Sequence, residues 1–341
     1  MAGTTSFPAP PREPGTWHLR TTIGPRGWLA ILALVVICGW SFHRMGLDRA
    51  TLQIGASVAA GVGLTGASEL GGGIGRFVVG MWPFAIGETT DINRIDGFDP
   101  ADLPWFSHVE TVTSTEKRFN TTTMALEEHS VTSTVLVEPV GYLVRIAGLM
   151  IATIEMAFWA TVIAVCLAAP LGMLGARTLG LPAAVVSAAR GVSSFLRALP
   201  ELVLAMILVL GFGFGPVPGI LALGLHSAGF FGKFFADDVE NADKGPQEAL
   251  RAGGASRLQV LRMAVIPQVW PQYVAYIQYI LERNVRTATI IGIVGAGGIG
   301  VELKGRFEMF HYQHVATILL AIFVTVVALE HIVGRVRKRL L

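Results

Sequence analysis

The densest group of ionisable residues in an apolar part of the sequence is Glu-Arg-Asn-Val-Arg at 282–286. Glu282 and Arg286 are four residues apart, so on a helix they share a face and can form an ion pair. Arg283 projects about 100° away from Glu282. Guanidinium groups match the oxygens of a tetrahedral oxyanion. We predict that Arg286 and Asn284 line a path for such an anion while Glu282 orients Arg286. The alternative is an ion-pair network that only holds helices together.

Other ionisable residues in apolar segments each allow two interpretations. Glu201 follows the helix-breaking Pro200, and Arg197 lies four residues before Glu201, so this pair either lines a path or locks helix packing. His226 either touches a path or is a hydrogen-bonded core residue. Lys233 can extend its ammonium group to the membrane surface. Charges at membrane depth are costly and usually face a bundle interior or an aqueous cavity.

A second motif occupies the polar segment 245–268. Pro246 suits the first position of a short helix, and Glu248 then places a carboxylate in the first turn, where the helix dipole favours it. Gly253 and Gly254 are predicted to end this helix. The segment therefore begins with a short helix that carries a negative charge near its start.

A second short helix is predicted to follow. Ser256 and Gln259 have the spacing of a capping box, which begins a helix, and Pro267 is expected to stop it. One apolar stripe is expected on it, formed by Leu258, Leu261 and Val265. The product is a helix-turn-helix with basic and apolar faces.

The composition places these motifs in a membrane protein. Of 341 residues, 52% are hydrophobic and only 15% are charged, whereas a soluble chain carries about 25% charge. The mean hydropathy is +0.58. Several apolar segments are long enough to cross a hydrocarbon core of roughly 30 Å. The expected spans are 28–45, 144–174, 184–213, 217–240, 269–296 and 312–334.

Basic residues predict the orientation of these spans, since cytoplasmic loops carry the excess of lysine and arginine. Six spans return the chain to its starting side, so both termini are expected in the cytoplasm. Four basic regions agree with this orientation: Arg12, Arg20 and Arg26 before the first span, Arg177 after the second, Lys244, Arg251, Arg257 and Arg262 after the fourth, and Arg335, Arg337, Lys338 and Arg339 after the last.

The region 46–143 is harder to assign. Residues 51–83 are apolar but rich in small residues, and one crossing there would move every later basic loop to the outside. Parity favours a helix along the outer interface, with a re-entrant or doubled crossing as the alternative. Residues 88–138 are polar and predict an external insert, with strands around Ser130–Val137.

The segment 245–268 resembles the cytoplasmic signature of the transmembrane subunits of ABC importers, E-A-A-x-x-x-G followed by I-x-L-P. Four residues are in register with it: Glu248, Ala249, Gly254 and Pro267. Leu250, Ala264 and Ile266 are mild departures. The resemblance implies that Glu248, Ala249, Gly254, Ser256 and Pro267 form a segment that docks in a groove of a separate ATPase.

Further segments are similar to the phosphonate-type permeases of this family, which import phosphonate, phosphate or phosphite. They are 197–201, 223–226, 282–286 and 292–300. The resemblance covers roughly 140–341, and the insert is longer than expected. Permeases for methionine or glycine betaine share the docking signature but not the 282–286 cluster, and they remain an alternative.

The resemblance implies an all-α membrane protein, the transmembrane domain of a type I ABC importer with about six transmembrane helices, cytoplasmic coupling helices and an external insert. Its expected parts are a tail at 1–27, a first helix at 28–45, the external region 46–143 and a core permease domain at 144–341. The implied location is the bacterial cytoplasmic (inner) membrane. The implied partners are a second copy, two ATPase subunits, an external substrate-binding protein and the lipid bilayer, with no nucleic acid.

The chain itself is expected to be no enzyme and to bind no cofactor or metal. It lacks the G-x-x-x-x-G-K-[S/T] phosphate loop, so ATP and Mg²⁺ are expected on the partner ATPase. Gly295–Gly300 fits G-x-G-x-x-G but ends a membrane span, where glycines serve a turn and close packing. The remaining alternatives are a self-sufficient secondary transporter, which needs inverted repeats that the sequence does not suggest, and a membrane-embedded enzyme, which needs a catalytic constellation.

Overall fold

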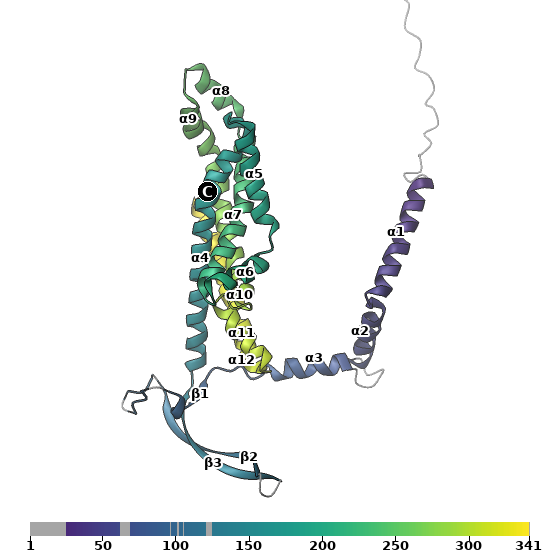
Figure 1. Ribbon diagram of the computed structural model, residues 1–341, viewed down its shortest axis with the longest axis vertical. Coiled ribbons are helices and arrows are strands. Elements are labelled where there is room, and N and C mark those ends of the chain that lie inside the picture. Colours follow the sequence, from purple (N-terminus) through teal and green to yellow (C-terminus); the bar gives the residue numbers. More distant parts are fainter. Residues whose placement is uncertain are drawn as a thin grey trace, which may run out of the picture. The chain divides into compact units, whose positions relative to one another are not determined.

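The computed structural model describes residues 25–61, 69–95, 97–100, 102–104, 106–120 and 125–340. These residues are mostly helical (Figure 1). The chain divides into two compact units, Met1–Phe77 and Val78–Leu341. The basic residues Arg12 and Arg20 of the expected tail lie outside the described residues.

The first unit begins with α1 (Pro25–Arg44), which matches the first expected span. Its apolar side chains are exposed all round, as in a helix whose surroundings are lipid. Two shorter helices follow, α2 (Leu47–Gly61) and α3 (Glu69–Gly80), where one interfacial helix over 51–83 was expected. Their position along the membrane surface stays a prediction.

The second unit contains a bundle built on α4 (Gly141–Gly175), whose 35 residues extend over roughly 52 Å. Figure 1 shows α5 and α7 running beside it. The other helices of the bundle are α5 (Ala183–Ala198), α6 (Glu201–Phe212), α7 (Pro216–Asn241), α10 (Ile266–Gly292), α11 (Ile299–Glu308) and α12 (Tyr312–Leu340).

Among the described residues, α1, α4, α7 and α12 are long and apolar enough to cross a bilayer, and α5 with α6 adds a fifth span if the bent pair counts as one. The remaining expected span, 269–296, corresponds to α10. This helix has 27 residues, so it is long enough, but its glutamines and its charges at 282–286 make it more polar than the others. The number of crossings therefore stays a prediction.

The expected span 184–213 is not one continuous helix, because the chain bends by 89° between α5 and α6. Pro200 has no N–H to donate, and its ring disfavours a helical conformation for the residue before it. Leu199 is accordingly extended, with φ −77° and ψ 122°. The bend places α5 and α6 in different directions within the bundle.

Glycines allow α4 and α7 to pack closely. A Cβ atom on Gly224 would lie 2.9 Å from Cγ2 of Ile163, and one on Gly232 would lie 3.1 Å from Cβ of Leu171. Alanines of α4, among them Ala160 and Ala168, are fully buried in the same contact. Small residues at helix contacts are typical of membrane bundles, where close approach of the backbones replaces the hydrophobic effect.

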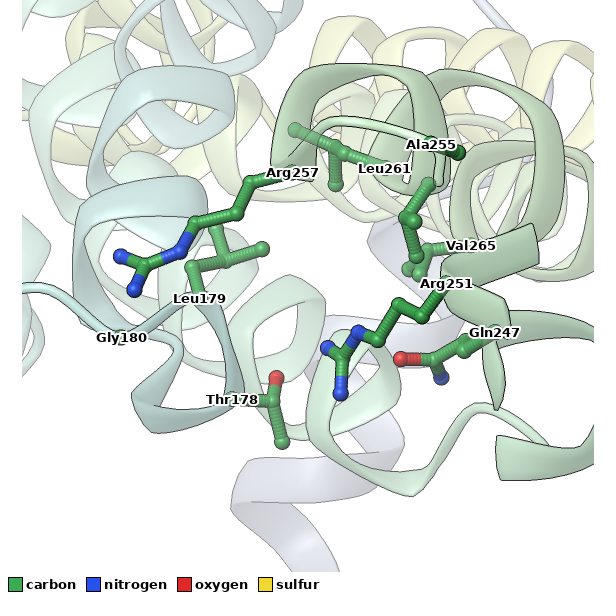
Figure 2. Close-up of a pocket in the computed structure, with 10 residues that line it drawn as sticks. Thr178, Leu179, Gly180, Gln247, Arg251, Ala255, Arg257, Leu261 and Val265 are labelled. Atoms are coloured by element: carbon green, nitrogen blue, oxygen red, sulfur yellow. The ribbon is translucent and has the colours of Figure 1, made fainter. Parts of the chain in front are cut away.

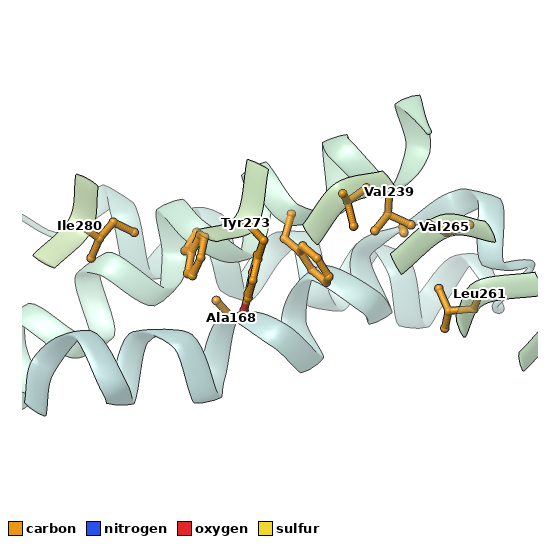
Figure 3. Close-up of a cluster of buried hydrophobic side chains, with 10 residues drawn as sticks. Ala168, Val239, Leu261, Val265, Tyr273 and Ile280 are labelled. Atoms are coloured by element: carbon orange, nitrogen blue, oxygen red, sulfur yellow. The ribbon is translucent and has the colours of Figure 1, made fainter. Parts of the chain in front are cut away.

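An aromatic cluster holds α7 against α10 (Figure 3). Phe231 stacks on Tyr273 with ring centroids 4.5 Å apart, and Phe235 lies 4.6 Å from the same ring. The cluster continues to Leu261 and Val265 at one end and to Ile280 at the other. It is therefore a continuous apolar seam along the bundle, named the aromatic seam below.

The insert contains a three-stranded antiparallel sheet with strand order β1-β3-β2, which adds a β element to the helical chain. Its strands are β1 (Glu88–Asp91), β2 (His108–Asn120) and β3 (Ala125–Glu138). The strand expected around Ser130–Val137 is confirmed as part of β3. Since β3 ends two residues before α4 begins, the sheet lies at the N-terminal end of α4.

Four charged side chains attach the sheet to the bundle. Glu88 of β1 accepts from Arg145 of α4 at 2.9 Å and from Arg306 of α11 at 3.3 Å. Glu302 also pairs with both arginines, at 3.3 Å and 2.7 Å respectively. A cyclic network of this kind holds the first strand of the insert to two helices.

The glycine run 295–300 lies in the turn between α10 and α11. Gly295, Gly297 and Gly298 have φ values of +90°, +85° and +70°, which side chains rarely adopt. The expectation of a turn with close packing is confirmed. A dinucleotide-binding motif would need a strand before these glycines, and the element before them is the helix α10.

Gly300 provides a test of this close packing. A Cβ atom there would meet the carbonyl oxygen of Thr289 and lie 2.8 Å from Cα of Gly292. We expect Gly300→Ala to lower the stability of the purified protein by about 1–3 kcal/mol through overpacking. Thermal unfolding in detergent measures this loss. Gly305→Ala in the same helix is the control, since no atom lies within 4 Å of its added Cβ. Equal melting temperatures for the two variants would contradict the prediction.

Candidate functional site

The segment between α7 and α10 folds as two short helices at the C-terminal end of α7. The first, α8 (Lys244–Ala252), is capped by Asp243, whose carboxylate accepts from the N–H of Gly245 at 3.1 Å. The helix therefore begins earlier than Pro246, and Glu248 lies beyond the first turn, so both expected positions are wrong. The capping aspartate was the missed signal.

The turn after α8 has the expected chemistry. Gly253 ends the helix, and Gly254 has φ +84°. Ser256 then begins α9 (Arg257–Val260) with a capping box that confirms the prediction. The N–H of Ser256 donates to Oε1 of Gln259 at 2.7 Å, and the N–H of Gln259 donates to Oγ of Ser256 at 3.4 Å. Ala249 and Glu248 are exposed on α8.

Pro267 does not stop the second helix. A π-helical turn, η3 (Leu261–Val265), joins α9 to α10, and Pro267 occupies the second position of α10. The wider turn lets Ile266 donate to the carbonyl of Leu261, so the helix continues although Pro267 has no N–H. The segment is therefore fused to α10 without a break.

The predicted apolar stripe divides into two parts. Leu261 and Val265 are buried in the aromatic seam, but Leu258 is 72% exposed, so the expectation is wrong for Leu258. Met263 is exposed as well. Outside the bundle, the segment thus presents apolar side chains next to exposed arginines, a surface suited to contact with another protein.

A cavity of about 430 Å³ separates this segment from the connection between α4 and α5 (Figure 2). Arg251 and Arg257 reach into it from α8 and α9, opposite Thr178. The guanidinium of Arg257 lies against Gly180, where an added Cβ would be 3.1 Å from Nη1. A smaller cavity of about 110 Å³ adjoins Glu248 and Arg251. Both arginines face open space beside the segment.

Two glutamines that the sequence did not single out fix the start of the segment. Nε2 of Gln247, buried, donates to the carbonyls of Asp243 at 3.0 Å and Ala242 at 3.3 Å. Oε1 of Gln268 accepts from the N–H of Asp243 at 2.8 Å. The available signal was a glutamine on each of the two helices that flank the segment, α8 and α10. The amide of a glutamine can donate to and accept from backbone groups.

A cluster of three ionisable side chains lies where α6, α7 and α10 meet. Glu201 is 2.9 Å from Nε2 of His226 and 3.3 Å from Nη2 of Arg283. The guanidinium of Arg283 also lies over the ring of Phe230, 5.2 Å from its centroid. The predicted pairing of Arg197 with Glu201 is wrong. The bend at Pro200 places Arg197 on α5 and Glu201 on α6, so the two residues do not share the face of one helix. Arg283 is the partner that the sequence reasoning missed.

His226 is held on both sides of its ring. Nδ1 lies 2.9 Å from the carbonyl oxygen of Leu199, which can only accept, and Nε2 faces the carboxylate of Glu201. The side chain is 7% exposed. His226 thus ties the bend between α5 and α6 to α7, which favours the core interpretation over direct contact with a path.

The 282–286 group divides between surface and core. Arg286 pairs with Glu282 at 3.1 Å, and its side chain is 51% exposed, as the path prediction requires. Asn284 is buried instead. Its Oδ1 accepts from Ser227 of α7 and its Nδ2 donates to Thr161 of α4, both at 3.0 Å. The structure therefore corrects the expectation for Asn284, which crosslinks three helices and faces no open surface.

Within the described residues, no three His, Cys, Asp or Glu side chains are grouped to hold a metal ion. The candidate site consists of ion-paired side chains on the helices of the bundle and of exposed charged and apolar side chains on the polar segment outside it. The apolar helices define a multi-pass membrane protein.

The chain belongs to the family described as "Binding-protein-dependent transport system inner membrane component", which matches residues 168–340. It is 51% identical over 261 residues to the putative phosphite transport system permease protein HtxE of Stutzerimonas stutzeri, with 76% of this chain and 100% of that protein covered. It is 39% identical over 197 residues to the phosphate-import permease protein PhnE of Mycolicibacterium smegmatis, with 58% and 37% covered. The chain is thus an ABC permease of the inner membrane.

Among solved structures, an inward-facing MetNI methionine ABC transporter matches with a TM-score of 0.50 at 19% identity. The match covers 56% of this chain and 94% of that chain, and it shows the fold of the bundle alone. The expected type of permease fold is confirmed. About a quarter of this chain has no counterpart in HtxE, since only 76% of it aligns.

Asn284 allows a test of the core between α4, α7 and α10. We expect Asn284→Ala to lower stability by about 1–3 kcal/mol, because it removes two buried hydrogen bonds and leaves the hydroxyl of Ser227 without its acceptor. Unfolding of the purified protein in a series of detergent–SDS mixtures measures the change. Gln272→Ala, on the exposed face of the same helix, is the control. An unchanged midpoint for Asn284→Ala would show that these bonds contribute nothing.

Proposed function

We propose that this chain is the membrane half of an ATP-driven importer of phosphorus oxyanions: phosphite, phosphonate or phosphate. Two copies form the translocation path, two separate ATPase subunits bind ATP and Mg²⁺, and an external binding protein delivers the anion. The observation that carries the proposal is the α8–α9 segment, which presents Glu248 and Gly254 outside the bundle and is fused to α10.

The fused segment supports mechanical coupling to an ATPase. Leu261 and Val265 extend the aromatic seam to the base of α9, so a partner that moves α9 also displaces side chains packed on Phe235 and Tyr273. Packed cores respond to such displacement by changing between discrete arrangements. Closure of an ATPase dimer would thereby reach the helices that line the path.

Charge within the bundle supports an anionic cargo. Arg283 and Arg286 project from α10, and each is paired with a carboxylate, Glu201 or Glu282. An arriving oxyanion can exchange with these carboxylates, because a guanidinium binds both by the same fork of donors. The names of the relatives, which include phosphite and phosphate permeases, point to the same class of cargo.

The orientation that we propose places α8, α9 and both termini in the cytoplasm and the β-sheet outside. Exposed Arg251, Arg257 and Arg262 lie at the α8–α9 end, as the bias of lysine and arginine toward the cytoplasm requires. The sheet lies at the opposite end of α4. Delivery from outside and energy from inside then act on opposite ends of one bundle.

Gly254 provides a matched pair of variants for the ATPase contact. We expect Gly254→Ala to reduce co-purification of the partner ATPase several-fold, because the left-handed φ of +84° costs an alanine about 1 kcal/mol and distorts the turn. Gly253→Ala is the control, since its φ is −78° and an added Cβ meets no atom closer than 3.5 Å. Affinity purification from cells that express both subunits measures the contact.

Glu248→Ala separates docking from local folding. Its carboxylate is exposed, so we expect the variant to keep wild-type stability but to lose ATPase co-purification and transport-linked ATP hydrolysis. Full retention of the ATPase by both Glu248→Ala and Gly254→Ala would contradict docking through this segment, whereas a wild-type chain that co-purifies no ATPase would favour a self-sufficient transporter.

Arg286 tests the path. We expect Arg286→Ala to lower the rate of phosphite or phosphate uptake at least tenfold in reconstituted vesicles, since a charge-assisted contact with the anion is lost. Arg335→Ala, an exposed arginine of α12 outside both the α8–α9 segment and the 282–286 group, is the control for a general effect of charge. An Arg286→Ala protein that assembles with its ATPase and transports at full rate would remove Arg286 from the path.

A further inference from the structure

A second cavity, of about 220 Å³, lies between α4, α5 and α7, away from both the α8–α9 segment and the Glu201 cluster. Three cationic side chains line it, together with two serines and one carboxylate. They are Arg190, Ser193, Ser194 and Arg197 of α5 and Lys233 and Asp237 of α7. The spacing along α5 places its four residues on one helix face.

The guanidinium of Arg190 is paired with neighbouring carboxylates and a backbone carbonyl. Its Nη2 is 2.7 Å from Glu240 and 3.9 Å from Asp237, and its Nε donates to the carbonyl of Gly175 at 2.8 Å. Arg190 and the carboxylates around it therefore hold the C-terminal ends of α4 and α7 to α5. One guanidinium faces two carboxylates there, so that end of the cavity has no unpaired positive charge.

Arg197 and Lys233 are different. Neither side chain forms an ion pair or a hydrogen bond with any residue that the structure describes, although both are half-buried. Ser193 is 3% exposed, and its hydroxyl likewise has no hydrogen-bond partner in the described part of the chain. Two cations and a hydroxyl thus face the same cavity without a partner among the described residues, with Asp237 as the one carboxylate in the lining, so their donors are available to an anion.

The helix packing that creates this arrangement is specific. A Cβ on Gly229 would lie 2.7 Å from the amide nitrogen of Arg197, and one on Gly232 would lie 3.2 Å from Oγ of Ser193. Glycines at these positions bring α7 against α5 and so bring Lys233 to the cavity. Lys233 is eight residues, roughly 12 Å, from the end of α7, a long reach for an ammonium group that seeks the membrane surface.

We propose that Ser193, Arg197 and Lys233 form a binding site for one small tetrahedral oxyanion of the phosphate class. The guanidinium supplies a planar pair of donors, the ammonium a point charge and the hydroxyl a third donor, which together match such an anion. The bound group is either a free oxyanion or the phosphate of a lipid headgroup. The binding site itself does not depend on the proposed function. If the bound group is a free oxyanion, the further statement that this anion is the imported cargo rests on the proposed function.

The test is binding of radiolabelled inorganic phosphate, and separately of phosphite in competition, to the purified full-length chain in detergent. We expect Arg197→Gln and Lys233→Gln each to weaken binding at least tenfold, because each removes a charged donor. Lys233→Arg, which keeps the charge, should retain most of the affinity. Arg177→Gln is the matched control, an exposed arginine at the same end of the bundle that lines neither cavity.

A second measurement distinguishes the two sources of the phosphate group. Native mass spectrometry of protein purified from membranes that contain phosphatidylglycerol reports lipid that stays bound. Lipid retained by the wild type and by Arg177→Gln, but lost in Lys233→Gln, supports the site with a lipid headgroup as its occupant. The site is overturned if neither phosphate nor lipid binds, or if Arg197→Gln and Lys233→Gln bind like the wild type.

Uptake assays keep this inference separate from the proposed function. Phosphate binding that depends on Lys233 in a protein that imports no phosphorus oxyanion would uphold the site and refute the cargo. Unchanged uptake of phosphorus oxyanions by Lys233→Gln, without any binding at the cavity, would uphold the cargo and refute the site. Thermal unfolding of each variant excludes loss of the fold as the cause.

Discussion

Hydrocarbon offers no hydrogen-bond partner, and this constraint organises the polar residues of the bundle. Asn284 satisfies both ends of its amide by joining Ser227 to Thr161. Glu201 stabilises the bend at Pro200 by pairing with His226 and Arg283. Each of these contacts joins different helices, so the polar groups that are most costly in lipid also determine which helices lie together. Arg197 and Lys233 stand out because they lack such partners among the described residues.

Apolar packing provides the second level of organisation. The aromatic seam joins α4, α7 and α10 and extends without interruption to Leu261 and Val265. The region that a partner protein can reach and the interior of the bundle therefore share one packed core. At the other end, Glu88 connects the sheet to Arg145 and Arg306 by charge. The seam thus reaches the end that carries α8 and α9, while the ion pairs of Glu88 hold the sheet at the opposite end.

The sequence predicted the elements better than their contacts. Hydropathy located the apolar helices, and the spacing of Ser256 and Gln259 predicted the capping box, because both signals are local. Pro200 was recognised as helix-breaking within the expected span 184–213, but the size of the bend, 89°, could not be read from the sequence. The pairing of Glu201 with Arg283 depends on how α6 meets α10, which no spacing within one helix reveals. The burial of Asn284 likewise depends on how α10 meets α4 and α7. The docking segment could be located without any such contact, because the family signature is a pattern within one stretch of sequence.

The π-helical turn at 261–265 has a mechanical consequence. Because α9, η3 and α10 are continuous from Arg257 to Gly292, they can act as a single lever of roughly 54 Å. Pivoting such a lever by about 5° at one end displaces the other end by roughly 5 Å, close to the rise of one helical turn. Arg283 and Arg286 lie roughly 39 and 44 Å along this lever, so the same small rotation at the water-exposed end moves them by about 3.5 Å.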